Sequence, residues 1–257
     1  MVTSRSTCVE SESVLLSQAH CVLVRTMPPG SLEQVVFRMD ALARLEVAGV
    51  PVINPPKAIE AAVDKYLALS KLQFAGLPVP DTLVCQSSEQ ALEGYHALGG
   101  DVVIKPLFGA EGRGITRISD IELAERAFKM LQRMGMVIYL QRFIPHPGFD
   151  VRLMLIGSQV FAMRRFNAND WRTNVSRGAK TELFHPDDQM VSLARDAAQA
   201  IGAKIAGVDL ICDPDCTWYV IEVNAVPGWQ ALARTLQVDV AREVIGYLRT
   251  VVQETGN

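Results

Sequence analysis

Two carboxylates and an amide near the C-terminus have the spacing of a divalent-metal site. Asp209 and Glu222 lie in two apolar runs that are separated by an Asp-Pro-Asp turn. If the runs pair with Cys212 near Tyr219, Asp209 faces Glu222, and Asn224 shares the face of Glu222. Opposed like charges destabilise a strand pair, so a cation is expected between them. Oxygen ligands of this kind favour Mg²⁺ or Mn²⁺, usually completed by substrate phosphates.

A glycine-rich segment beside a lysine could hold phosphate. Gly109, Gly112 and Gly114 lie between two predicted strands, and Lys105 ends the first of these strands. Glycines let backbone N–H groups approach phosphate oxygens closely, and a lysine at this place can reach the same oxygens. The spacing matches neither a Walker loop nor a dinucleotide fingerprint. A flexible hairpin loop and a solvated strand end are the alternatives. Lys65, in a charged helix, carries no signal of its own.

Arginines and an amide form a further candidate group. Asp150 and Arg152 begin a predicted strand with both charges on one face, and the next polar loop contains Arg172, Asn174 and Arg177. Guanidinium and amide groups spaced in this way can grip a triphosphate or a substrate carboxylate. An ordinary surface loop is the alternative interpretation of the same residues.

The composition is that of an ordinary globular protein. The chain has 257 residues, 49% of them hydrophobic and 21% charged, with a formal net charge of -3. This suits one large domain or a few small ones and favours neither nucleic-acid nor membrane binding. The polar N-terminus is not typical of a signal peptide, and the five scattered cysteines suit a reducing cytoplasm. Cys212 and Cys216 could bind zinc, but no second pair completes a zinc set.

The elements that must position these residues form a mixture of hairpins and helices. Residues 1–20 show no pattern and are expected to be loose, whereas strands at 21–24 and 50–53 flank a helix at 32–47, and a second helix covers 58–74. Further elements are expected as strands at 101–106, 116–118 and 136–141, a hairpin of 151–156 with 159–164 about Gly157-Ser158, a helix opened by a capping box at 119–122 and ending near Gly135, and helices at 191–201 and 238–253. The mixture predicts α+β subdomains and no regular doubly wound sheet.

In this order, the motifs resemble those of an ATP-grasp ligase, specifically of the RimK-type branch that adds glutamate or related amino acids through an amide bond. The resemblance covers roughly residues 64–229, with its motifs at residues 64–65, 103–106, 109–114, 140–144, 150–152, 172–178, 206–209 and 222–228. It implies an α+β (α/β) ATP-grasp fold in three parts. These parts are a shortened N-terminal α/β pre-ATP-grasp portion at 1–60, a small subdomain with the glycine-rich loop at 61–141, and a C-terminal subdomain with the metal site at 142–257.

The resemblance also implies a role for each candidate residue. The implied ATP-binding residues are the phosphate ligands Lys65 and Lys105, the lid glycines Gly109, Gly112 and Gly114, the adenine hinge Gln141, Arg142, Phe143 and Ile144, and the ribose carboxylate Asp150. The implied catalytic residues are Arg152, Arg172, Asn174 and Arg177. The implied metal ligands are Asp209, Glu222 and Asn224. Family members usually carry an acidic residue where Arg142 stands, but the hinge binds the base mainly through its backbone.

The implied activity is that of an ATP-dependent carboxylate–amine ligase. An acceptor carboxylate attacks the γ-phosphate of ATP, and the amine of glutamate or a related amino acid displaces phosphate from the resulting acylphosphate. Implied partners are ATP, two Mg²⁺ or Mn²⁺ ions, the amino acid, and an acceptor that is a protein, a peptide or a pterin- or deazaflavin-type cofactor. Nucleic acid and membrane are not expected as partners, and a homo-oligomer is compatible. The alternatives are a catalytically impaired ATP-binding module and another ATP-grasp ligase of amino-acid or peptide synthesis.

Overall fold

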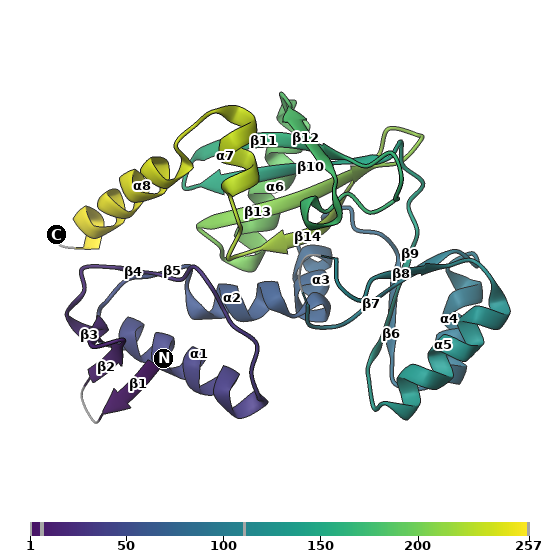
Figure 1. Cartoon of the computed structure of the whole chain (residues 1–257), viewed down its shortest axis with the longest axis horizontal. Helices are drawn as coiled ribbons and strands as arrows, with labels where there is room; N and C mark the ends of the chain where they lie inside the picture. Colours follow the sequence, from purple (N-terminus) through teal and green to yellow (C-terminus); the bar gives the residue numbers. More distant parts are fainter. Residues whose placement is uncertain (1, 6–7, 110–111, 256–257) are drawn as a thin grey trace.

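The computed structural model describes residues 2–5, 8–109 and 112–255. Figure 1 shows three parts in chain order: a small N-terminal part in purple, a compact sheet with two helices in teal, and a larger sheet with green and yellow helices. The mixed helix and sheet content agrees with the predicted α+β class. Within the described residues, no helix is long and apolar enough to cross a membrane. The division at residues 60 and 141 stays a prediction.

The N-terminal part combines a small antiparallel sheet with a β-α-β unit. Its elements are β1 (Val2–Arg5), β2 (Cys8–Ser11), β3 (Val14–Leu15), the 3-10 turn η1 (Leu16–Gln18), β4 (Val22–Leu23), α1 (Leu32–Val47) and β5 (Val52–Ile53). β4 and β5 are parallel, as expected, and Ser31 forms a capping box at the start of α1. The expectation that residues 1–20 are loose is wrong, because β1 pairs with β2 and Val9 packs with Ala41 and Leu45.

The single helix expected at 58–74 is two helices, α2 (Pro56–Val63) and α3 (Lys65–Phe74). Asp64 separates them, because its carboxylate accepts hydrogen bonds from the backbone N–H groups of Tyr66 and Leu67. Aspartate is a strong N-cap residue and therefore starts a new helix here. Lys65 is consequently the first residue of α3 and does not lie in mid-helix.

A four-stranded antiparallel sheet in the order β6-β9-β7-β8 forms the teal part of the chain. Its elements are β6 (Thr82–Cys85), α4 (Ser88–Ala97), β7 (Val102–Lys105), β8 (Thr116–Ile118), α5 (Ile121–Arg133) and β9 (Ile138–Arg142). The helices α4 and α5 bury one face of this sheet around Phe128 and Tyr95. The predicted capping box at Ser119 is wrong, because Asp120 is the N-cap and accepts from the backbone of Leu123. Asp120 directly precedes the first residue of α5, whereas Ser119 lies one residue too far from it to cap the helix.

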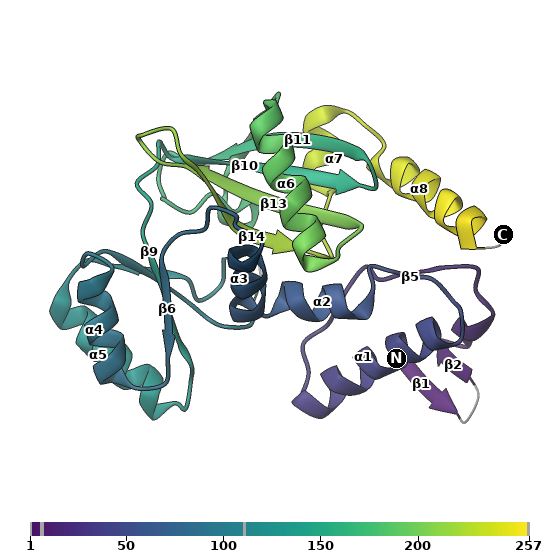
Figure 2. The same cartoon turned by 180° about the vertical axis from the view of Figure 1, so that it is seen from behind.

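The larger sheet is antiparallel, with five strands in the order β12-β11-β10-β13-β14. Its elements are β10 (Phe149–Ile156), β11 (Gln159–Phe166), the 3-10 turn η2 (Val175–Arg177), β12 (Lys180–Leu183), α6 (Asp188–Ile201), β13 (Ile205–Cys212), β14 (Trp218–Asn224), α7 (Gln230–Leu236) and α8 (Val240–Thr255). One face packs on α2, α3 and α6, and the other packs on α7 and α8 (Figures 1 and 2). Leu153 and Met154, neighbours on β10, enter the two cores on opposite faces.

The β13–β14 hairpin brings Asp209 opposite Glu222, as predicted, but through a different pairing near the turn. Cys212 pairs with Trp218 and not with Tyr219. The register then shifts by one residue next to Asp209, which leaves Ile221 as the extra residue of a β-bulge. The bulge restores the alignment of the two carboxylates. A site in this sheet therefore depends on an irregularity that the alternation of side chains does not reveal.

Candidate active site

The candidate residues converge on a narrow cleft between the two larger sheets. A cavity of about 100 Å³ is lined by polar residues from several segments, namely Lys105, Gln141, Arg142, Asp150, Arg165, Arg172, Asn174, Asp209 and Glu222, together with apolar residues that include Phe143, Ile144 and Ile221. A neighbouring cavity of about 50 Å³ shares Lys105, Gln141 and Glu222 with it and adds Lys65 and Tyr139. The fold thus gathers phosphate, metal and hinge candidates in one place.

Asp209 belongs to a buried group of four charged side chains. Arg152 donates two hydrogen bonds of 2.7 Å to its carboxylate, and Arg165 donates a third of 2.8 Å. Arg165 also binds Asp150, at 2.8 and 2.5 Å. Burial alone would raise the pKa of Asp209, but Arg152 and Arg165 outweigh it and lower this pKa to about 2. Asp209 is therefore an anion at neutral pH.

The same contacts test whether Asp209 could bind a metal ion. A carboxylate offers about four lone-pair sites. The three arginine bonds leave one of these sites on Oδ1, which accepts from Arg152 alone among the described residues. Asp150 lies deeper, 2% exposed, with both oxygens on Arg165. The geometry places Asp150 where it holds Arg165, and its predicted contact with a ribose stays a prediction.

Glu222 is the second carboxylate of the site and makes no ion pair with any other described residue. It is half-buried and faces Asp209 across the hairpin. Asn224 follows on β14, and its Oδ1 accepts from the backbone N–H of Val226 at 2.9 Å. No cluster of three or more His, Cys, Asp or Glu side chains occurs in the described part of the chain. A divalent cation here would therefore need substrate oxygens to complete its ligands.

Two lysines face the same space as Glu222. Lys105 donates through Nζ to Gln141 Oε1 at 2.6 Å, and Lys65 donates to the carbonyl of Gly109 at 2.8 Å. Burial lowers the pKa of Lys105 to about 8, although the charge of Glu222 opposes this change. Burial also lowers the pKa of Lys65. Two partly buried ammonium groups without an ion-pair partner among the described residues provide a place for a polyanion.

The glycine-rich loop contacts the polar loop that carries the other arginines. Arg172 donates to the carbonyl of Ile115 at 3.1 Å, and Arg177 donates to that of Gly112 at 3.1 Å. Gly112 has a φ of +69°, and a Cβ at this position would collide with the amide of Asn174. Ala110 and Glu111 lie outside the described residues. The described part of the loop therefore lies against Arg172, Asn174 and Arg177, and Ile115 at its end lines both cavities.

The predicted hinge connects β9 to the larger sheet. Arg142 forms an ion pair with Asp81, with 3.1 Å between Nε and Oδ2, and its backbone N–H donates to the Asp81 carbonyl. Arg117 covers the ring of Phe143 at 3.5 Å. Ile144 is buried and lines the same cavity as Phe143. The predicted contact of this hinge with adenine stays a prediction.

Two residues of the site region escaped the sequence analysis. Arg165 was recognisable, because a hairpin about Gly157-Ser158 pairs Ile156 with Gln159 and hence Asp150 with Arg165. Asn54 had no such signal, since Asn-Pro-Pro is typical of a plain turn.

Asn54 is 1% exposed and joins the N-terminal part to the start of β13 and to the residue that follows β14. Its Nδ2 donates to the carbonyls of Ile205 (2.6 Å) and Ala225 (2.5 Å). Its Oδ1 accepts from the backbone of Lys204 (2.6 Å) and Ile205 (2.9 Å). These bonds fix the loop that follows Asn224.

Comparison of the sequence with known proteins gives consistent matches. The profile of the RimK-like ATP-grasp domain matches residues 62–248. The chain is 32% identical to a tetrahydromethanopterin:alpha-L-glutamate ligase of Methanosarcina acetivorans over 277 aligned positions, which cover 96% of this chain and 85% of the relative. It is 30% identical to a glutamate–LysW ligase of Sulfolobus acidocaldarius, with 81% and 76% of the two chains covered.

Solved structures show the same fold. The ATP-grasp ligase PsnB, in a complex with its minimal precursor, Mg and ADP, superposes with a TM-score of 0.74 at 21% identity, covering 96% of this chain and 84% of that one. A RimK domain ATP-grasp protein of Sphaerobacter thermophilus superposes with a TM-score of 0.70 at 24% identity, covering 88% and 80%. The fold match extends over the N-terminal part as well as over both larger sheets.

Proposed function

Because the chain belongs to the RimK-type ATP-grasp ligases, we propose that it uses ATP to join L-glutamate, or a related amino acid, to a carboxylate-bearing acceptor. One observation carries the proposal: Asp209, Glu222 and Lys105 line one cavity, and Lys65 lines the neighbouring cavity together with Glu222 and Lys105. Opposed acids and unpaired ammonium groups match a metal-bound triphosphate. The names of the relatives support glutamate as the amino acid.

The reaction that we propose has two steps. An oxygen of the acceptor carboxylate attacks the γ-phosphorus of ATP. The bond between the γ-phosphorus and the oxygen that bridges it to the β-phosphate breaks, ADP leaves, and an acylphosphate forms. The amine of glutamate then attacks the acyl carbon, phosphate leaves, and the nitrogen loses a proton to give the amide. Lys65, Lys105 and Arg172 stabilise the negative charge that moves between the phosphate oxygens. No protein nucleophile is required, because the acceptor supplies it.

Asp209, Glu222 and Asn224 would hold Mg²⁺ or Mn²⁺, and we propose that two ions bind there. A divalent ion supplies Lewis acidity to the phosphate oxygens when bound. Arg152 and Arg165 keep Asp209 ionised and fixed for this purpose. The purine of ATP would accept from the Ile144 amide beside the ring of Phe143. Gln141 orients Lys105, and Gly109, Gly112 and Gly114 would lie close to the phosphates.

The test is a screen of the purified chain with ATP, Mg²⁺, single amino acids and acceptors that include pterin, deazaflavin and peptide acids. The proposal expects ADP release together with an acceptor that is heavier by one glutamyl residue. Release of ADP with another amino acid would change the substrate but retain the reaction. ATP binding without turnover for every combination would instead indicate an ATP-binding module.

A further inference from the structure

Arg172 is a candidate catalytic side chain that comes from an irregular loop. It lies between β11 and η2, outside any described helix or strand, and it lines the cavity of Lys105, Asp209 and Glu222. A guanidinium on a long side chain loses conformational freedom when it binds a ligand in a single geometry. An arginine that acts on phosphate from such a loop therefore needs a second group that fixes it in place.

Asp170, two residues earlier, holds both the side chain and the backbone of Arg172. Nε of Arg172 donates to the two carboxylate oxygens of Asp170 at 3.0 Å each, and Nη2 lies 2.8 Å from Oδ2. The backbone N–H of Arg172 donates to Oδ1, also at 3.0 Å, which closes a turn typical of aspartate. The hydrogen bonds from the Arg172 side chain lower the pKa of Asp170, so that Asp170 is an anion at neutral pH.

Neighbouring residues fix the same loop against the cleft. The ring of Trp171 meets that of Phe143 edge-on, with 5.7 Å between the centroids and 87° between the planes. Asn167 Nδ2 donates to the backbone carbonyl of Arg172 at 3.3 Å. The side chains of Arg172 and Asp170 are 25% and 21% exposed, so water competes only in part for the ion pair. The pair is therefore held in one place relative to Phe143 and the cavity.

A count of hydrogen-bond donors shows what Arg172 has left for a ligand. An arginine side chain has five N–H donors. Asp170 takes the N–H of Nε and one N–H of Nη2, and the carbonyl of Ile115 takes one N–H of Nη1 at 3.1 Å. One N–H on Nη1 and one on Nη2 make no hydrogen bond to another described residue. Two donors on neighbouring nitrogens match two oxygens of a phosphate group. Arg172 can therefore bind phosphate without leaving Asp170.

We propose that Asp170 is a positioning residue, which holds the guanidinium of Arg172 so that its two remaining N–H groups bind oxygens of the ATP phosphates. Asp170 lines neither cavity of the cleft and acts through Arg172. This inference rests on the proposed function, in which Arg172 stabilises the charge of the phosphates, and it adds the residue that makes Arg172 effective there.

The direction of the effect separates positioning from simple electrostatics. Asp170 is a negative charge near a site for a polyanion, so its removal would strengthen ATP binding if charge alone mattered. Positioning predicts the opposite, because a released guanidinium loses more conformational freedom on binding. Asp170→Asn keeps the size of the side chain but removes its charge and the forked ion pair. This variant should therefore bind nucleotide more weakly than the wild type.

The test is a calorimetric titration of the full chain with Mg²⁺ and the non-hydrolysable ATP analogue AMPPNP, which requires neither an acceptor nor turnover. Arg172→Ala should raise the Kd about tenfold or more, as for the loss of charge-assisted hydrogen bonds. Asp170→Asn should raise it about fivefold, less than the loss of the whole guanidinium. In the Arg172→Ala background, Asp170→Asn should raise the Kd no further, because two residues that act as one unit are not additive.

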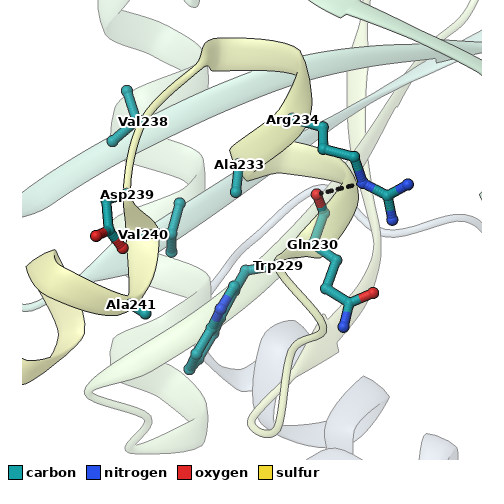
Figure 3. A pocket seen from close by; sticks show the side chains of 8 residues that line it. All are labelled: Trp229, Gln230, Ala233, Arg234, Val238, Asp239, Val240 and Ala241. Atoms are coloured by element: carbon teal, nitrogen blue, oxygen red, sulfur yellow. Dashed lines mark hydrogen bonds between the residues drawn. The ribbon is translucent and has the colours of Figure 1, made fainter.

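Two control variants remove the same chemical groups elsewhere. Glu182→Gln removes a carboxylate that pairs with Arg164 in the larger sheet, outside both cavities. Arg234→Ala removes an exposed arginine that, like Arg172, donates to a backbone carbonyl, in this case that of Gln230 (Figure 3). Arg234 lines a groove between α7 and α8, and none of the described residues that line this groove lines either cavity. Both variants should keep the wild-type Kd within about twofold.

The proposal has three results that overturn it. The first is unchanged or tighter AMPPNP binding by Asp170→Asn. The second is an equal rise of the Kd on Asp170→Asn in the wild-type and Arg172→Ala backgrounds, because such a rise does not pass through Arg172. The third is absence of AMPPNP binding by the wild-type chain. Thermal unfolding verifies that each variant is folded, and Asp170→Ala replaces Asp170→Asn if the asparagine variant does not fold.

The ligase function fails separately. A Kd that depends on Asp170 only when Arg172 is present, without ADP release for any acceptor, would retain the positioning role and reject the ligase. ADP release by Asp170→Asn with the kcat and the KM for ATP of the wild type would retain the ligase and reject the positioning role.

Discussion

Replacement of Arg165 by methionine should strongly destabilise the chain. Arg165 donates to Asp150 and Asp209, and all three side chains are at most 3% exposed. Methionine keeps much of the apolar volume but leaves Asp150 buried without a cation. Loss of one partner of a buried ion pair costs about 3–5 kcal/mol of unfolding free energy. Arg164→Met is the control, since Arg164 and its partner Glu182 are both 39% exposed and contribute below about 1 kcal/mol.

The loss should become smaller as the pH falls. In the wild-type chain, Arg152 and Arg165 overcome burial and hold the pKa of Asp209 at about 2, against 3.8 ordinarily. A carboxylate whose pKa is lowered on folding contributes stability above about pH 4, and loses it as the pH falls toward 2. The contribution is about 2 kcal/mol. Without Arg165, the facing carboxylates favour protonation, so the variant recovers stability on acidification, whereas the wild type keeps the contribution of Asp209 down to about pH 4.

Urea denaturation followed by circular dichroism, at about pH 7 and about pH 4.5, measures both effects. We expect Arg165→Met to lose about 3–5 kcal/mol at the higher pH and less at the lower one. Arg165→Lys keeps the positive charge but not the forked hydrogen bonds, so its free energy of unfolding should lie between those of the wild type and Arg165→Met. It replaces Arg165→Met in the assay if the methionine variant does not fold. A methionine variant within about 1 kcal/mol of the wild type at both pH values would refute the role of the buried charges.

Three further predictions concern the lysine, the loop and the joint between the parts. Because the pKa of Lys105 is about 8, its ammonium group loses its proton above that pH. The Kd for ATP, measured by titration, should therefore rise about tenfold from pH 7 to pH 9 in the wild type and stay constant in Lys105→Met. Gly112→Ala should raise the KM for ATP, whereas Gly135→Ala, also at positive φ but with open space around its Cβ, should affect stability alone in parallel kinetic and melting assays. Asn54→Ala leaves buried backbone groups unpaired and should cost about 3 kcal/mol or more in urea denaturation; an unchanged midpoint would contradict this.

The local parts of the fold were readable from the sequence because local chemistry decides them. The helix at 32–47 has a capping box at its start and apolar spacing along its length, and the structure has these same bounds. The hairpin at Gly157-Ser158 follows from its turn. The short strand β6 carries no alternation in its burial, which explains why it was not expected. At Asp64, one capping side chain outweighs a continuous helical pattern.

The candidate site was predictable where strand periodicity applies and not where distant segments meet. Alternation along the strands places Asp209 opposite Glu222. The expected pairing of Cys212 with Tyr219 is one residue out of register, but the bulge at Ile221 compensates for this difference before the two carboxylates are reached. The contacts of Arg25 with Pro227 and of Asn54 with Ala225 join residues more than 170 positions apart. No pattern within a single segment encodes such contacts, so these two residues could be found only in the structure.

The central claim is that the carboxylates of the β13–β14 hairpin serve the transfer of phosphate from ATP. The most direct measurement is the rate of ADP release with Mg²⁺, glutamate and an acceptor, compared between the wild type, Glu222→Gln and the matched control Glu182→Gln. Glu222→Gln keeps the shape of the side chain but removes its charge, and turnover should fall about 10²-fold or more, whereas the control should keep the wild-type rate. Wild-type turnover in Glu222→Gln would contradict the account.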